Sequence, residues 1–159
     1  VIRETPNYSD AIVDLNKVIE KNKDNKVFYC QYAYARASSV INKAKNINNF
    51  KDFENIDHIV HSNTLNKYEW EIIRKIISWP FVLQQSSFSK QPHKVINYIE
   101  DLCSNFHSLW NKGKENKSLR FIDTTNPEQT ITKLVWINSF RIVLKNAFNI
   151  IGIQAHEQM

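Results

Sequence analysis

Residues 27–36 read Val-Phe-Tyr-Cys-Gln-Tyr-Ala-Tyr-Ala-Arg, and this stretch decides how the rest of the chain is interpreted. It places three tyrosines and one arginine on the opening turns of a predicted helix. Tyr32 and Arg36 are four residues apart, so they share one helical face. Aromatic rings beside a guanidinium can stack unpaired bases and hold phosphate. The stretch therefore indicates a helix with a surface suited to single-stranded nucleic acid.

The composition favours an all-α protein of one domain. The chain has 159 residues, a length that suits a single folded domain. It contains only two glycines and four prolines, with 42% hydrophobic and 23% charged residues. These values describe a helix-rich globular protein and exclude a disordered or repetitive sequence.

The charge points to an anionic partner. Twenty-one Lys and Arg against 16 Asp and Glu give a net charge of +5 and a pI near 9.2. Many basic proteins bind no nucleic acid, so the placement of the cations matters more than their number. In this chain aromatic and basic residues alternate at the same predicted helix ends, which favours RNA or DNA.

Neither cysteine usage nor hydropathy suggests secretion. Cys30 and Cys103 each lie in a helical pattern, which predicts buried thiols in a reducing compartment. No run reaches the ~18 apolar residues needed to span a bilayer, and residues 1–6 lack the form of a signal peptide. We expect a soluble, cytoplasmic protein with no membrane partner. Because it begins with valine, we also expect it to be cut from a longer chain, although a processed protein would begin in the same way.

Helical spacing and capping residues divide the chain into five to six predicted helices. Pro80 is expected to end one of them near residue 78, because proline cannot donate to the helical ladder. Asn126 and Pro127 predict a helix start, and Gly152 predicts a helix end. Residues 46–57 and the basic segment 112–126 are predicted loops, and 120–122 is a short ambiguous piece that could be extended. The predicted helices cover residues 9–21, 27–44, 64–78, a short segment at 80–86, 92–110 and 127–151.

Few residues suggest catalysis, a metal or a cofactor. His58 and His61 are three residues apart and could bind zinc only if further ligands converged on them. Gly113 and Gly152 are the only glycines, so no glycine-rich phosphate loop can be built. No nucleophile lies in a recognisable turn. We therefore predict no catalytic residue, no metal and no bound cofactor in this chain.

Four stretches, in the same order, resemble the anticodon-binding (DALR-type) domain of class I arginyl-tRNA synthetases. The first is 28–36, similar to the family's aromatic-x-Gln-Tyr-Ala-His-Ala-Arg pattern, and the second is 72–80, which ends in Trp-Pro. The third, 92–102, begins Pro-His-Lys-Val, and the fourth, 143–159, contains Gly-Ile-Gln-Ala-His-Glu-Gln-Met. The chain departs from the family pattern at Tyr34, Ala147 and His156, where histidine, glycine and proline are usual.

The resemblance implies an antiparallel helical bundle of about five to six helices, occupying residues 9–159, after a linker at 1–8 from a missing upstream catalytic part. It implies a monomeric module that binds the anticodon stem-loop of tRNA(Arg) within an arginine-tRNA ligase. The His-x-Gly-His and Lys-Met-Ser-Lys signatures that hold ATP in that class are absent from the chain. ATP binding is therefore expected only in the full-length enzyme, and this fragment is expected to be inactive.

The resemblance also implies which residues contact the anticodon. Tyr32 would stack on a base while Arg36 contacts phosphate or a base edge, and Phe106 with Trp110 would repeat this spacing on another helix. Met159 would close over the bases, and the segment 24–29 would shape the same pocket. Tyr34 lies off this face and is expected to pack in the core. The predicted tRNA-binding residues are Tyr29, Tyr32, Arg36, Phe106, Trp110 and Met159.

Two alternatives remain open from the sequence. The chain could be a stand-alone basic helical module that binds protein or nucleic acid in general. It could also be the equivalent domain of another class I synthetase, such as the cysteinyl enzyme.

Overall fold

The computed structural model describes residues 25–51, residue 53 and residues 64–159. This part of the chain is helical and contains no β-strand, which confirms the all-α prediction. It holds four α-helices, slightly fewer than the five to six expected, and the predicted helix at 9–21 lies outside the described residues. The elements are α2 (Lys26–Lys45), η1 (Asn48–Phe50), α3 (Lys67–Phe88), α4 (His93–Glu115), η3 (Lys117–Leu119) and α5 (Pro127–Ile151).

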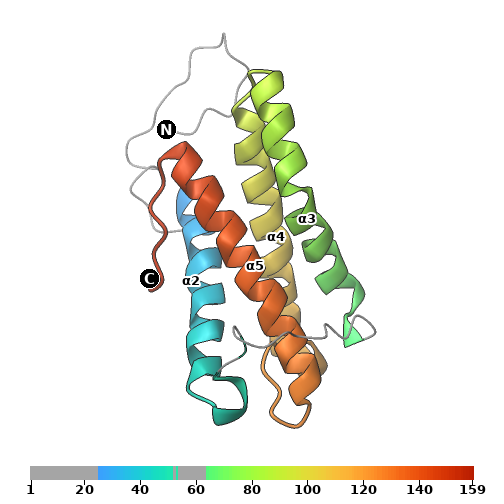
Figure 1. The fold of residues 1–159 in the computed structure, drawn as a ribbon. Coiled ribbons are helices and arrows are strands. Elements are labelled where there is room, and N and C mark those ends of the chain that lie inside the picture. The colour runs from blue at the N-terminus through green and yellow to red at the C-terminus, as the bar shows by residue number, and fades with distance from the viewer. Residues whose placement is uncertain (1–24, 52, 54–63) are drawn as a thin grey trace.

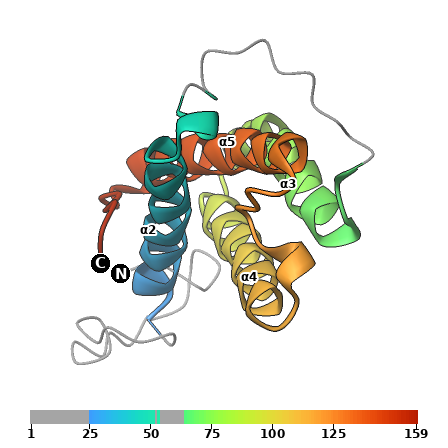
Figure 2. The same cartoon turned by 90° about the horizontal axis from the view of Figure 1, so that it is seen from below.

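The four helices form an antiparallel bundle in which α2 and α4 run in the same direction and α3 and α5 run in the other (Figure 1). Seen from below, α2 and α4 lie side by side on one side of α5, and α3 packs against α4 and α5 (Figure 2). The residues after α5 descend beside α2 (Figure 1). Residues 27–36 therefore pack against both α4 and α5, and the side of α2 that faces α4 forms the α2–α4 seam.

Side-chain caps explain where the helices begin. Asn66 Oδ1 accepts from the N–H groups of Tyr68 (2.9 Å) and Glu69 (3.1 Å), and Glu69 Oε2 accepts from Asn66 N–H (2.8 Å). This reciprocal pair is a capping box, which satisfies donors that the first turn leaves free. Asn126 and Pro127 start α5 as predicted, and Gly152 ends it at φ 75°, a conformation that favours glycine.

Pro80 does not end the third predicted helix. It lies inside α3, which continues to Phe88, so the predicted helix 64–78 and the short helix at 80–86 are one element. Buried residues lie on both sides of the proline, and Trp79 stacks on Tyr98 of α4 with ring centroids 5.3 Å apart. This packing against α4 outweighs the roughly 3 kcal/mol that proline costs inside a helix.

The predicted loops are shorter than the sequence suggested. Helix α4 continues five residues beyond Trp110, and Gly113 in this last part packs closely against the returning chain, where a Cβ would lie 3.3 Å from Leu119 O. The loop between α4 and α5 therefore begins at Asn116, and residues 120–122 are irregular. In the segment 46–57, Phe50 and Phe53 are buried, so the described part of this loop packs on the core.

An aromatic stack fills the core. The Phe106 ring lies between those of Phe140 (centroids 4.5 Å apart) and Phe121 (5.6 Å), which joins α4, α5 and the segment between them. Tyr34 is also buried and packs against Phe148, as predicted from its position off the Tyr32–Arg36 face. Cys30 and Cys103 are free and buried.

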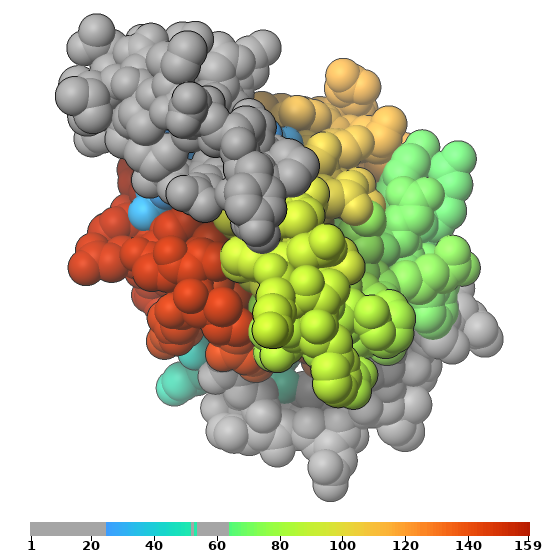
Figure 3. Space-filling view, turned by 90° about the horizontal axis from the view of Figure 1, so that it is seen from above, coloured from blue at the N-terminus to red at the C-terminus, as the bar shows by residue number. Residues whose placement is uncertain are grey.

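One face of α3 carries large apolar side chains that are exposed to solvent. Ile77, Phe81 and Phe88 are 70%, 62% and 76% exposed and lie on one side of the helix. Viewed from above, the yellow-green end of α3 protrudes beside the red end of α5 (Figure 3). We call these three residues the α3 stripe. No helix in the described part of the chain is both long enough and apolar enough to cross a membrane.

Candidate nucleic-acid interface

Arg36 is held between two aromatic rings at the α2–α4 seam. The guanidinium carbon lies 4.1 Å from the centroid of Tyr32 and 5.0 Å from that of Trp110. Both distances lie within cation–π range. The η2 nitrogen of Arg36 also donates to the hydroxyl of Tyr32 (3.1 Å), and Phe28 stacks on Tyr32 at 6.1 Å. The helical spacing of 28, 32 and 36 on α2 produces this column of side chains.

His107 of α4 fixes the other end of the guanidinium. An Arg36 η1 nitrogen lies 2.9 Å from His107 Nδ1, and His107 Nε2 lies 3.1 Å from the carbonyl oxygen of Tyr29. Because arginine only donates and a carbonyl only accepts, Nδ1 must accept and Nε2 must carry the proton. Burial lowers the pKa of His107, and the nearby guanidinium lowers it further, which favours this neutral form. We refer to Tyr32, Arg36, His107 and Trp110 as the Arg36 cluster.

The Arg36 cluster is open to solvent on one side. Tyr32 is 36% exposed, and Arg36 and Trp110 are half-buried. A guanidinium has five N–H groups, and the described bonds to His107 and Tyr32 use two of them. The other N–H groups can bind phosphate or a base edge while the rings hold the arginine in place. The sequence therefore predicted this pairing of Tyr32 and Arg36, and the structure brings Trp110 to it.

Tyr29 packs against His107 of the Arg36 cluster. Its ring centroid lies 4.4 Å from that of His107, and partial burial raises the pKa of its hydroxyl. Within the segment 24–29, Asn25 caps α2 and residues 26–29 form its first turn, whereas Asp24 lies outside the described residues. Tyr29 is thus a half-buried packing partner of His107 in this structure.

Phe106 does not lie where the resemblance implied. It is 0% exposed, because its ring is enclosed by Phe140 and Phe121. A ring with no exposed face cannot stack on a base, so the prediction that it contacts the anticodon does not fit this structure. Only Trp110 of the predicted Phe106–Trp110 pair reaches the surface. Phe106 packs against it at 6.2 Å and so supports it from the core.

Met159 lies on the other side of α2. The tail after α5 is held by Gln31 Nε2, which donates to Gln154 O (3.0 Å), and by the Arg141–Glu157 ion pair (3.1 Å). Figure 2 shows the chain end on the side of α2 that faces away from α4. Met159 is 51% exposed there. The structure does not place it against Trp110, and its closing role stays a prediction.

A groove continues from the Arg36 cluster along the same seam. It has a volume of about 340 Å³ and is lined by α2, the end of α4, the last residue of η3 and the chain that follows it. Trp110 belongs to both the groove and the Arg36 cluster. The lining residues are Val40, Lys43, Trp110, Gly113, Lys114, Leu119, Arg120, Phe121 and Ile122.

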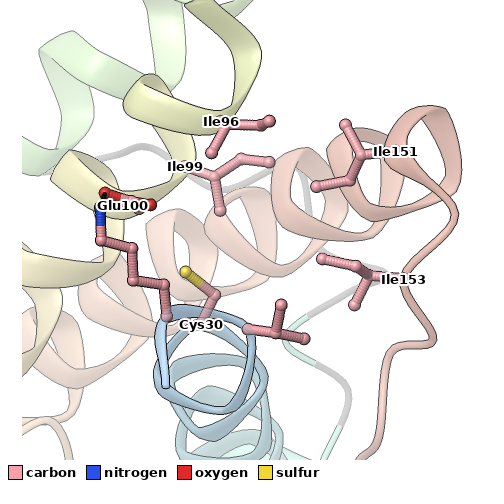
Figure 4. Close-up of a pocket in the computed structure, with 8 residues that line it drawn as sticks. Cys30, Ile96, Ile99, Glu100, Ile151 and Ile153 are labelled. Carbon is pink, nitrogen blue, oxygen red and sulfur yellow. Dashed lines mark ion pairs between the residues drawn. The ribbon is translucent and has the colours of Figure 1, made fainter. Parts of the chain in front are cut away.

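A second cavity, near Cys30, is too small for a ligand. It lies between the starts of α2 and α4 and the end of α5, beside the Lys26–Glu100 ion pair of 3.2 Å (Figure 4). Its volume is about 10 Å³, roughly the minimum for one water molecule. No group of three or more potential metal ligands occurs among the described residues, and His58 and His61 lie outside them.

Sequence reasoning missed His107 and the groove. His107 is 71 positions from its partner Arg36, and nothing in the local pattern of α4 distinguishes it from a core residue. The groove depends on the close approach of Gly113 to Leu119, which follows from the packing of a predicted loop. The cluster of Lys and Arg in that segment was the only sequence signal for it.

Relatives of this chain are arginine-tRNA ligases. It is 37% identical over 147 residues to the arginine-tRNA ligase of Bartonella bacilliformis, and the match covers 92% of this chain and 25% of that protein. The corresponding enzymes of Bartonella quintana and Sinorhizobium medicae are 38% and 37% identical with the same coverage. The chain therefore spans about a quarter of the length of these relatives.

The fold agrees with a solved structure from Campylobacter jejuni, provisionally named an arginyl-tRNA synthetase. The TM-score is 0.72 at 24% identity, over 92% of this chain and 29% of the other. The family model for the DALR anticodon-binding domain matches residues 30–159. These residues include Tyr32, Arg36, His107, Trp110 and the groove. The chain belongs to the DALR anticodon-binding domain family.

Proposed function

We propose that this domain binds the anticodon loop of tRNA(Arg) as part of an arginine-tRNA ligase. The observation that carries the proposal is Arg36, fixed between Tyr32 and Trp110 with one side open to solvent. Unpaired bases of an RNA loop stack on exposed aromatic or guanidinium planes, and cations hold the backbone between them. The net charge of +5 favours association with RNA.

Catalysis belongs to another part of the polypeptide in this proposal. The chain lacks the His-x-Gly-His and Lys-Met-Ser-Lys signatures, and two glycines are too few for a phosphate loop, so its residues do not fit ATP. An upstream catalytic part would activate arginine and transfer it to the tRNA. Its absence from this chain agrees with the quarter of the relatives' length that the chain covers. We further propose that the domain acts as a monomer in the cytoplasm, where its free cysteines would stay reduced.

Equilibrium binding to RNA stem-loops tests the tRNA proposal. The chain should bind the anticodon stem-loop of tRNA(Arg) at least tenfold more tightly than a scrambled loop on the same stem. Equal affinity for both would instead support a basic module that binds nucleic acid in general. Tighter binding to the stem-loop of tRNA(Cys) would support the equivalent domain of the cysteinyl enzyme.

A further inference from the structure

We propose that the groove beside the Arg36 cluster binds a second unpaired nucleotide of the same RNA loop. The base would enter against Trp110 and the apolar wall, and its phosphates would meet the basic rim. This inference rests on the proposed function, because it extends the RNA-binding surface from one nucleotide to two.

The size and lining of the groove suit one nucleotide. Its volume of about 340 Å³ falls within the ~300–1,000 Å³ typical of small-molecule sites, far above what one water needs. The walls are apolar and include the aromatic residues Trp110 and Phe121, with Leu119 and Ile122. Such a lining accepts the faces of a base without selecting its hydrogen-bonding edge.

The charges around the groove match a phosphate backbone. Lys43 comes from α2, Lys114 from α4 and Arg120 from the chain after η3, so three cations approach from three directions. No carboxylate lies among the lining residues. An apolar or positively charged ligand would gain nothing from this rim that water does not offer. The rim favours a ligand that carries negative charge outside an apolar ring.

The outer wall is held in place from inside the protein. The Nζ of Lys133 donates to the carbonyl oxygens of Ser118 (3.2 Å) and Arg120 (2.8 Å), and Lys133 is buried. Gly113 lets Leu119 approach α4 to a distance that a Cβ would make tight. The wall formed by 119–122 is therefore braced on both sides, and the groove does not depend on a loose loop.

Trp110 joins the groove to the Arg36 cluster. Its ring lies 5.0 Å from the Arg36 guanidinium, and the same side chain lines the groove. Neighbouring nucleotides of an RNA loop can thus reach the Arg36 cluster and the groove at the same time. This continuity is why we assign the groove to an RNA nucleotide.

A matched pair of double variants tests the rim. Lys43→Ala with Lys114→Ala removes two groove cations, whereas Lys45→Ala with Lys117→Ala removes two exposed lysines nearby that do not line the groove. The groove pair should weaken binding to the stem-loop roughly two- to 30-fold. It should also reduce the slope of log K against log[salt] by about 1.4, at ~0.7 for each single-strand phosphate contact. Equal effects of the two pairs would overturn the inference.

A fluorescent base tests the groove itself. Stem-loops that carry 2-aminopurine at one loop position at a time should show two positions quenched on binding. Tyr32→Ala should restore emission at one of them, and Leu119→Trp, which fills the groove, should restore it at the other. If Leu119→Trp folds, as judged by circular dichroism, and changes neither position, the groove does not hold a base.

The outcomes separate this inference from the proposed function. If the chain binds tRNA(Arg) selectively and the groove variants have no effect, the tRNA proposal is supported and the proposal that the groove binds a nucleotide is overturned. Equal affinity for scrambled loops, with the groove effects retained, supports the nucleotide groove and overturns the assignment to tRNA(Arg).

Discussion

Arg36 shows how one residue can be fixed and still remain available. Its guanidinium plane contacts the rings of Tyr32 and Trp110, and it donates to His107. An arginine side chain that is free in solution loses about 2 kcal/mol of rotamer entropy when a ligand fixes it. In this domain the contacts have already fixed most of these rotations before a ligand binds. A ligand therefore meets a cation that is already ordered.

Removal of the Tyr32 ring should weaken RNA binding. Stacking on an aromatic contributes about 1–3 kcal/mol per base, so Tyr32→Ala should reduce affinity for the stem-loop by roughly five- to 150-fold. Phe88→Ala is the control, because Phe88 is an exposed aromatic residue on α3, outside the Arg36 cluster. Fluorescence anisotropy measures both. A loss below twofold for Tyr32→Ala, or an equal loss for Phe88→Ala, would contradict the site.

The salt dependence of binding should reveal what Arg36 contacts. If it meets phosphate, Arg36→Ala should reduce the slope of log K against log[salt] by about 0.7. If it contacts only a base edge, affinity should fall while the slope stays unchanged. Arg36→Lys keeps the charge and loses the planar fork, so it should preserve the slope and still lose affinity.

His107 should make stability depend on pH near neutrality. Its pKa is lowered in the folded protein, mainly by burial, so below the ordinary value of about 6.5 the unfolded chain binds more protons. Stability is therefore fully present above pH ~6.5 and falls as the pH drops toward the lowered pKa. Urea unfolding between pH 8 and pH 5.5 should show this loss, and His107→Gln should have a weaker pH dependence. Parallel curves for the two proteins would contradict the buried neutral form.

At the residue scale, the sequence predicted contacts between side chains of the same helix. The spacing of Tyr32 and Arg36 follows from the helical repeat, and their contact is present. The contact with His107 crosses between helices, so no spacing rule could predict it. The burial of Phe106 was missed for the same reason, since it depends on Phe121 and Phe140.

At the scale of one element, α3 shows packing prevailing over local preference. Pro80 lies on its exposed side, where the ring avoids the core, while Trp79 contacts α4. The helix starts from a strong capping box at Asn66 and ends only at Phe88. A rule based on proline alone placed the end ten residues too early, at 78. The capping residues of α5, in contrast, predicted both of its ends.

Replacement of Pro80 should stabilise the domain. Pro80→Ala restores an N–H that can donate to the carbonyl of Ile76 and removes an unfavourable residue from a helix interior. The free energy of unfolding should rise by about 1–3 kcal/mol, measured by urea denaturation. Pro92→Ala should change it by less than about 0.5 kcal/mol, because Pro92 caps α4 where no such bond is missing. A loss of stability in Pro80→Ala would show that the ring contributes packing of its own.

At the scale of the whole molecule, a buried ion pair connects three elements. Lys133 of α5 lies 3.8 Å from Glu69 of α3, and the same Nζ binds the chain around η3. Burial raises the pKa of Glu69 and lowers that of Lys133, so each charge depends on the other. The pair thus couples the start of α3 to the outer wall of the groove.

Loss of one partner should cost more than loss of both charges. Lys133→Met leaves the Glu69 carboxylate buried without its cation and should destabilise the domain by about 3–5 kcal/mol. Lys133→Met combined with Glu69→Gln should be less destabilised than Lys133→Met alone, because no uncompensated charge remains. Thermal unfolding of the single and double variants measures this. Strict additivity would show that the two side chains do not interact.

The whole-molecule fold could be predicted because it is carried by many local signals. Caps, apolar spacing and the four family-like stretches agree on the order of the helices. The structure confirms this order for the described residues, with 64–78 and 80–86 joined in α3. The groove could not be predicted, because it is produced by the contact of Gly113 with Leu119 and by a lysine that the core encloses.

The α3 stripe gives this chain two surfaces that respond to salt in opposite directions. If the domain binds RNA as proposed, added chloride would screen the Arg36 cluster and release the RNA, whereas sulfate strengthens the attraction between exposed apolar side chains such as Phe81 and Phe88. In sulfate, copies of the chain would associate through α3 and fewer would be available to RNA, which would resemble weaker RNA binding. In chloride at micromolar protein, the same titration would report on RNA alone.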